Sequence, residues 1–210
     1  MNAKKLILLL SIIGLITISC KNEKNTTDKK SAEVVKKTTS KVIHKDVITW
    51  KGYKPTGSHY GVIKVKSTDL KMDKEALITG SITIDMATIK NSDLKDPQDN
   101  KDLIGHLSNA DFFDIVKYPT AKFQITNTSS DKENVYEIEG DLTIKGITKK
   151  TKFQGKTAVN ENGDTVLRGV VKIDRTDFGI EYKSKKFFNN LKNAFINDEF
   201  DMSFKIKLDK

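Results

Sequence analysis

Apolar and polar residues alternate along most of the chain beyond residue 42, and this pattern predicts extended strands with one buried face. The clearest run lies near the C-terminus, where every second residue is apolar: Phe200, Met202, Phe204, Ile206 and Leu208. Four earlier segments repeat this period: Ile63 and Val65; Ile82, Ile84 and Met86; Ala121, Phe123 and Ile125; and Tyr136, Ile138, Leu142 and Ile144 across Gly140. The pattern predicts a mainly antiparallel β-protein.

Turn residues divide these strands, and one segment has a helical pattern. Residues 160–164 read Asn-Glu-Asn-Gly-Asp and predict a hairpin between strands at 153–159 and 166–173, while Gly146 marks another tight bend. Residues 102–109 follow the Asp-Pro pair at 96–97 and have apolar residues at helical spacing. We therefore expect about eight or nine strands and one short helix. Periodicity alone does not separate a closed barrel from a two-sheet sandwich.

The N-terminus has the pattern of an export signal. Lys4 and Lys5 precede an apolar run from Leu6 to Ile16 that is too short to span a membrane, and Cys20 follows it. This arrangement resembles a bacterial lipoprotein signal, in which cleavage after residues 1–19 leaves a lipidated cysteine. The alternative, an ordinary cleaved signal, leaves a free thiol in an oxidising compartment. We expect Cys20 to be lipidated and the protein to be anchored in the cell envelope, facing the periplasm or the surface.

The charge distribution bears on the choice of partner. The formal net charge is +9, but residues 1–41 alone hold nine lysines against three carboxylates. Residues 20–41 are polar without an apolar period, so we expect a flexible linker beside a membrane anchor. The folded domain, residues 42–210, is close to balanced. Together with export, this argues against a nucleic-acid partner.

Four ordered segments resemble the YceI-like domain family: residues 80–89, 107–123, 140–149 and 173–180. The resemblance covers residues 42–210, and the opening strand at 50–53 resembles the lipoprotein branch of the family. It implies a lipocalin-like antiparallel barrel of about eight strands with a helix-bearing excursion over one mouth. It further implies a tunnel that holds an isoprenoid or similar long-chain lipid, and no catalytic residues.

Aromatic and apolar residues near the predicted mouth are the candidate ligand contacts. They are Ile84, Met86, His106, Phe112, Phe113, Tyr118, Phe123, Phe178, Tyr182, Phe187 and Phe188. The alternative for any one of them is ordinary barrel core. Within the Asp111-Phe112-Phe113 triplet, we expect Asp111 to cap or tie the loop, one ring to point inward and the other to pack under the helix.

A charged ligand head would require a cation at the mouth, for which Arg175, Lys183 and His106 are candidates. For Arg175 we favour a structural role, as a salt-bridged corner beside Asp174 and Asp177. His106 has the alternative of a half-exposed helix position.

Patterns for catalysis and metal binding are missing from the sequence. His44, His59 and His106 lie far apart without paired ligands, and there is neither a Gly-x-Ser-x-Gly motif nor a phosphate-binding glycine loop. We therefore expect no metal, no cofactor other than a bound lipid, and no enzymatic activity.

Three functions remain open at this stage. The first is an envelope lipoprotein that binds or carries a long apolar amphiphile. The second is a structural or interaction module with a barrel filled by side chains. The third is an enzyme acting on a lipid or quinone precursor, for which Asp85, His106 and Arg175 lining one cavity would be the first indication.

Overall fold

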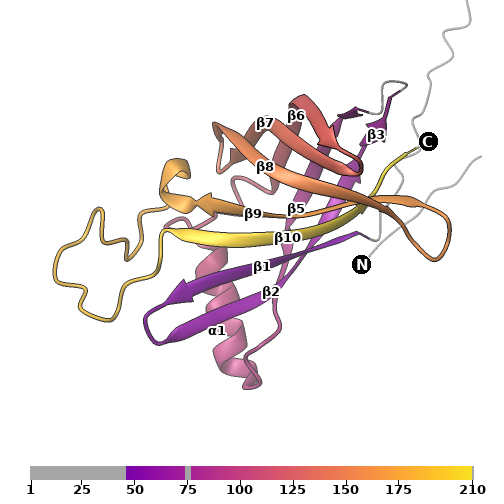
Figure 1. Cartoon of the computed structure of the whole chain (residues 1–210). Coiled ribbons are helices and arrows are strands. Elements are labelled where there is room, and N and C mark those ends of the chain that lie inside the picture. Colours follow the sequence, from indigo (N-terminus) through magenta and orange to yellow (C-terminus); the bar gives the residue numbers. More distant parts are fainter. Residues whose placement is uncertain (1–45, 74–76, 210) are drawn as a thin grey trace, which may run out of the picture. The chain divides into compact units, whose positions relative to one another are not determined.

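The computed structural model describes residues 46–73 and 77–209, which form a closed antiparallel barrel (Figure 1). Its eight strands are β1 (Val47–Lys54), β2 (Gly57–Thr68), β5 (Ser81–Asn91), β6 (Thr120–Lys132), β7 (Val135–Ile144), β8 (Ile147–Val159), β9 (Thr165–Asp174) and β10 (Glu199–Lys207). They are ordered β1-β10-β9-β8-β7-β6-β5-β2, and β1 also pairs with β2. The predicted barrel is confirmed, because this last pairing closes the sheet and excludes a sandwich. A separate pair, β3 (Lys71–Met72) and β4 (Ile78–Thr79), lies outside the barrel sheet.

Strand β7 shows how the sequence builds the wall. Its residues alternate strictly between buried and partly exposed, with Tyr136, Ile138 and Leu142 among the buried ones. It turns into β8 through Lys145 and Gly146, which both have positive φ (50° and 76°). A two-residue turn of this kind matches the twist of the two strands, and glycine adopts a positive φ without steric cost. The bend predicted at Gly146 is thus a tight hairpin.

The helix begins earlier than the sequence pattern predicts. Helix α1 spans Pro97–Ser108, whereas the prediction began at residue 102. Asp96 caps the helix: its side chain accepts hydrogen bonds from the N–H groups of Gln98 and Asp99. Pro97 occupies the first turn, where its missing N–H has no intrahelical partner to lose. The Asp-Pro pair is therefore a start signal here and not a break.

Aromatic rings pack against glycines in the barrel wall. A Cβ atom added at Gly140 in β7 would lie 2.5 Å from Cζ of Phe123, and one added at Gly169 in β9 would lie 2.8 Å from Cζ of Phe204. The absence of side chains at these two positions lets the rings fold back onto the wall. Phe153 packs against both of these rings, with centroid distances of 5.4 Å and 5.5 Å. Three rings thereby fill the half of the barrel that lies away from α1.

Substituting Gly140 tests this packing. In Gly140→Ala the new methyl group would also lie 2.4 Å from the carbonyl oxygen of Gln124, so both the ring and strand β6 must move. We expect a loss of about 1–3 kcal/mol in the free energy of unfolding, measured by urea denaturation. Gly52→Ala is the matched control in β1, because no atom lies within 4 Å of the added Cβ. Equal effects of the two substitutions would contradict the ring-packing argument.

Several predictions concern residues outside the described ranges. The signal peptide (1–19), the lipidation of Cys20 and the linker at 20–41 all fall there. Within the described ranges, no helix is long and apolar enough to cross a membrane.

Candidate functional site

The half of the barrel next to α1 contains an apolar cavity of about 450 Å³. Its walls are inward-facing strand residues, including Trp50, Ile63, Ile84, Met86, Ile89, Ala121, Leu142, Ile144, Ile173, Phe200 and Met202. Residues of α1 and the loops cover it, including Leu103, His106, Leu107, Phe112, Phe113, Tyr182, Phe195 and Ile196. A volume of this size is typical of small-molecule sites.

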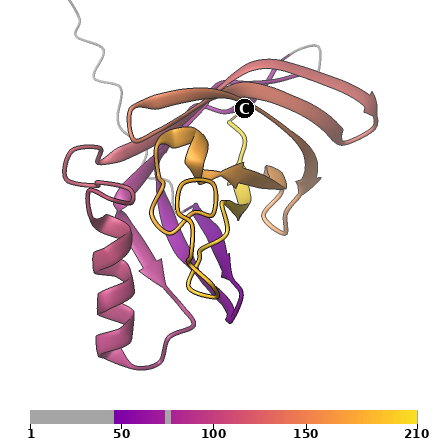
Figure 2. The same cartoon turned by 90° about the vertical axis from the view of Figure 1, so that its left-hand side faces the viewer.

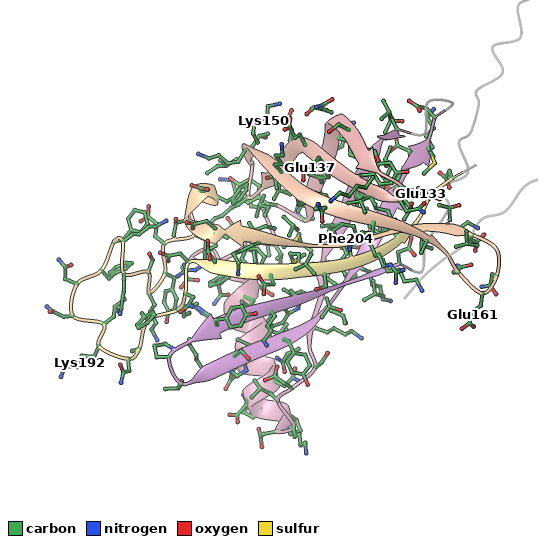
Figure 3. All side chains as sticks on the ribbon, viewed as in Figure 1. Glu133, Glu137, Lys150, Glu161, Lys192 and Phe204 are labelled. Atoms are coloured by element: carbon green, nitrogen blue, oxygen red, sulfur yellow. The ribbon has the colours of Figure 1, made fainter. Side chains whose placement is uncertain are left out.

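A second, narrow cavity of about 60 Å³ adjoins the first inside the barrel. Ile84, Leu142, Ile173 and Met202 line both cavities, so the two spaces meet at this layer of side chains. Phe123, Phe153 and Phe204 line the narrow part, and Figure 3 marks Phe204 on β10. The hollow is therefore wide near α1 and narrow beyond the shared layer. This shape suits one long chain entering from the α1 end.

The mouth lies between three segments that come from distant parts of the sequence. They are the β1–β2 hairpin, helix α1, and the loop of residues 179–198 that connects η1 (Arg175–Phe178) to β10. Figure 2 looks onto this end, with α1 beside the hairpin and the loop in front.

Arg175 fastens the two ends of this loop. Its side chain is 2% exposed and donates hydrogen bonds to the carbonyl oxygens of Ile180 (2.7 Å), Ile196 (3.0 Å) and Asn197 (3.1 Å). Its Nη2 atom lies 3.4 Å from Oδ1 of Asp198. Burial lowers the pKa of Arg175, and the Asp198 carboxylate opposes this effect. A buried guanidinium with several protein acceptors is mainly structural.

This geometry corrects the partner expected for Arg175. It forms a structural corner, but its carboxylate partner is Asp198 and not Asp177. Asp174 instead accepts hydrogen bonds from Thr176 and Lys186. Arg175 also lines the cavity, although its donors are largely engaged by protein acceptors.

His106 places an unsatisfied polar atom beside the apolar cavity. Its Nε2 atom is buried and has no hydrogen-bond partner among the described residues. The ring lies 4.3 Å from the ring of Tyr182 and 5.6 Å from that of Phe112, measured between centroids. Because a buried polar atom without a partner is costly, this atom is suited to a polar group supplied by a ligand.

A hydrogen-bond network attaches α1 to the barrel at the mouth. Asp93 accepts from the N–H of Tyr60 (2.8 Å) and from the Asn91 side chain (2.6 Å), and its other oxygen lies 2.7 Å from Nδ1 of His59. Asn100 of α1 donates to the side chain of Asn91 (3.2 Å). Burial alone would raise the pKa of Asp93, but the hydrogen bonds from Tyr60, His59 and Asn91 together lower it. The ionised carboxylate therefore stabilises the mouth.

The lowered pKa of Asp93 gives a pH-dependent prediction. A carboxyl group with a depressed pKa in the folded state adds stability above its unfolded pKa and loses it as the pH falls through the folded value. We expect Asp93→Asn to cost about 1–2 kcal/mol at neutral pH. The difference from the wild type should shrink at about pH 3, because the carboxyl group of the unfolded chain is then mostly protonated and the stabilisation is lost as the pH falls toward the lower pKa of the folded state. Urea denaturation at the two pH values measures this, and a constant difference would contradict it.

Comparison with known proteins places this barrel in a family. The YceI-like domain profile matches residues 26–208. The chain belongs to the YceI-like family. UPF0312 proteins of Pseudomonas putida (strain W619) and Pseudomonas savastanoi pv. phaseolicola are 36% and 37% identical over 81 residues. These matches cover 36% of this chain, which spans 42% of the length of these curated relatives.

Solved structures share the fold of this YceI-like protein. BcnA of Burkholderia cenocepacia aligns with a TM-score of 0.64 and 24% identity, over 79% of this chain and 97% of that one. A polyisoprenoid-binding domain of Saccharophagus degradans aligns with a TM-score of 0.53 and 10% identity, over 77% of this chain and 92% of that one. At these identities the comparisons show the fold alone.

Seven of the eleven candidate ligand contacts line the hollow of this YceI-like barrel. Ile84, Met86, His106, Phe112, Phe113 and Tyr182 line the wide cavity, while Phe123 and again Ile84 line the narrow one. Both residues of the Phe112-Phe113 pair line the cavity, and the Phe112 ring also lies 5.6 Å from the ring of His106 in α1. Their roles as ligand contacts stay predictions.

The other four candidates lie away from both cavities. Tyr118 packs against the hairpin at Gly146, and Phe178 is 2% exposed within the core. Phe187 and Phe188 are exposed on the loop after η1. These four residues are close in sequence to segments that form the mouth, but closeness in sequence does not specify the direction of a side chain.

The structure also bears on the expectations for Asp111, for Asp85 and for a metal site. Asp111 is exposed and the helix cap is Asn109, so the loop is tied by main-chain bonds and by Lys145, which donates to the Ala110 carbonyl. His106 and Arg175 line the wide cavity, whereas Asp85 is not among its lining residues. Among the described residues, no group of three or more His, Cys, Asp or Glu side chains is arranged to hold a metal ion.

Sequence reasoning missed several wall residues. Trp50, Phe153, Phe200, Met202 and Phe204 line the hollow but were not among the candidates. The period-two run at 200–208 was the available signal, since it marks one inward face. Four of these residues, Phe153, Phe200, Met202 and Phe204, are only partly buried, whereas Trp50 belongs to the buried core.

Proposed function

We propose that this protein binds one long apolar amphiphile inside its barrel. The observation that carries the proposal is the apolar cavity of about 450 Å³ near α1, with a narrow cavity of about 60 Å³ adjoining it. At about 30 Å³ per non-hydrogen atom, the wide part accommodates roughly 15 such atoms. This is the size of a C16 chain or of about three isoprene units. The description of the Saccharophagus degradans neighbour as a polyisoprenoid-binding domain supports the isoprenoid class.

Affinity would come from buried apolar area. Each Å² of apolar surface removed from water contributes roughly 25 cal/mol before the costs of association. Aromatic and aliphatic walls supply this without any catalytic group. We propose accordingly that the protein acts by binding or carrying its ligand and not by transforming it. The alternative of a solid, side-chain-filled barrel does not fit a cavity of about 450 Å³.

The polar end of the ligand would lie at the level of His106. The buried Nε2 atom lacks a partner among the described residues and lies beside the cavity near the mouth. Lys183 also lines the mouth and supplies a cation nearby. An uncharged head that exchanges a hydrogen bond with His106 satisfies this atom and leaves the chain in the hollow.

The binding domain would act at a membrane. We propose that Cys20 is acylated and that residues 20–41 hold the barrel near the lipid from which it is loaded. Metabolic labelling with a fatty-acid probe should add mass to the wild-type protein and not to Cys20→Ser.

Analysis of the purified protein tests the binding proposal directly. Native mass spectrometry and organic extraction should release about one long-chain amphiphile per protein molecule. Protein that remains empty when purified from its own cells and that takes up neither a C16 alcohol nor farnesol would exclude the proposal.

Substitution of His106 tests the position of the head group. Trp50 is the only tryptophan and lines the cavity, so its fluorescence reports binding. We expect the wild type to bind hexadecanol about tenfold more tightly than hexadecane, because only the alcohol satisfies Nε2. In His106→Leu this preference should disappear, while His106→Gln should retain part of it. An unchanged preference in His106→Leu would place the head elsewhere.

A further inference from the structure

The loop between η1 and β10 is strongly basic along its projecting part. Residues 182–197 contain four lysines and neither aspartate nor glutamate. Figure 3 shows this loop, with Lys192 labelled, at one end of the barrel and Glu133 and Glu161 at the other. Lys192 thus lies at the opposite end of the barrel from Glu133 and Glu161 (Figure 3).

Two phenyl rings stand beside these lysines and face solvent. Phe187 and Phe188 are 48% and 46% exposed. Their N–H groups both donate to the carbonyl oxygen of Ser184, at 3.2 Å and 3.0 Å, and the Ser184 hydroxyl accepts from the N–H of Lys186. Ser184 itself is completely buried. The buried Ser184 anchors this turn, and the rings of Phe187 and Phe188 point into solvent and not into the core.

Three of the four lysines are available to an external anion. Lys186 pairs with Asp174. Within the part of the chain that the structure describes, Lys183, Lys185 and Lys192 form no ion pair with a carboxylate. Lys185 lies instead 3.7 Å from the centroid of the Phe195 ring, which lines the cavity. Basic and aromatic side chains together are typical of segments that bind the interface of anionic membranes.

Both ends of the same loop form part of the cavity mouth. Tyr182 and Lys183 line the cavity on one side of the exposed rings, and residues 193–197 line it on the other. A ligand of low aqueous solubility must pass between this cavity and a lipid phase. We propose that residues 183–192 form a membrane-docking surface that seats the cavity mouth on an anionic bilayer. The role of this surface in loading the barrel rests on the proposed function, whereas the docking itself does not.

A fluorescence experiment measures docking at the loop itself. The full chain with Cys20→Ser is used as the background, so that no acyl anchor forms and the N-terminal segment is the same in every variant. Phe187→Trp places a reporter in the loop. Val159→Trp is the control, at a 71% exposed position beside the 160–164 turn that bears Glu161. The vesicles contain equal parts of phosphatidylglycerol and of brominated phosphatidylcholine, whose bromine atoms quench tryptophan fluorescence. The signal of buried Trp50 is measured in the Cys20→Ser protein without a second tryptophan and is subtracted.

We expect the vesicles to quench the reporter at 187 about twofold more than the reporter at 159. Adding Lys185→Glu and Lys192→Glu should weaken vesicle binding through the loop about tenfold at low salt. Vesicles of phosphatidylcholine alone should have little effect.

Equal quenching at positions 187 and 159, or no quenching at 187, would overturn the docking proposal. Equal quenching by vesicles with and without phosphatidylglycerol would overturn its dependence on anionic lipid. Organic extraction of the same preparations separates the two proposals. A quenched loop on a barrel that takes up no lipid refutes ligand binding alone, and a lipid-filled barrel with an unquenched loop refutes docking alone.

Discussion

Replacing Ala121 with phenylalanine is expected to empty the barrel of ligand while leaving it folded. Ala121 is buried on β6, pairs with Ile84 across the sheet and lines the wide cavity. A ring at this position projects into space that the proposed chain occupies. The cavity is large enough to accept the ring, so the cost of overpacking should be small compared with that in a filled core.

We expect the amount of co-purifying lipid in Ala121→Phe to fall by about tenfold or more, which corresponds to at least about 1.4 kcal/mol of binding free energy. Quantitative extraction measures the lipid, and circular dichroism checks the fold. Val170→Phe is the matched control, because Val170 is exposed on the outside of β9. Undiminished lipid in folded Ala121→Phe would mean that the ligand does not occupy this cavity.

Replacing Arg175 with methionine is expected to destabilise the protein more than any other substitution considered. The change removes the donors that hold the carbonyl groups of Ile180, Ile196 and Asn197 and leaves these buried acceptors without partners. It also leaves Asp198 without its cation. Breaking a buried, hydrogen-bonded charge typically costs about 3–5 kcal/mol.

Urea denaturation should show this loss, and limited proteolysis should show cleavage within residues 179–198 at lower protease concentrations than in the wild type. Arg168→Met is the control, since Arg168 is exposed on the outside of β9. Arg175→Lys should recover only part of the stability, because an ammonium group does not reach several acceptors in one plane. A wild-type midpoint in Arg175→Met would show that the loop is held by other contacts.

The strands could be predicted because their signal is local. In β7, for example, each residue's side of the sheet follows from its place in a period of two, and Tyr136, Ile138 and Leu142 all face inward. The hairpin at Gly146 and the turn at 160–164 depend equally on adjacent residues. The predicted start of α1 was wrong because an Asp-Pro pair such as Asp96-Pro97 can signal either a helix cap or a helix break. The hydrogen bonds that Asp96 accepts show that it is a cap.

The direction of the loop side chains could not be predicted in the same way. Phe112 and Phe113 face the cavity, whereas Phe187 and Phe188 face solvent, although each pair is an adjacent Phe-Phe. Loops have no fixed period, so their side chains point where distant contacts permit. For the second pair, the buried Ser184 and the three hydrogen bonds that it accepts hold the turn that carries the rings.

The amino-acid sequence by itself determined the β-strands, their inward faces and the family, because these depend on neighbouring residues and on short ordered motifs. Only the tertiary structure decided that β1 pairs with β10 as well as with β2 and so closes the sheet, that Arg175 ties the mouth loop, and that the interior remains hollow. Closure and hollowness depend on the volume left when side chains from all eight strands meet. Wall glycines such as Gly140 leave room for rings in one half, whereas the rings of Trp50, Phe112 and Phe200 line the half beside α1 and leave a cavity there. That volume is a non-local property, which no stretch of sequence specifies alone.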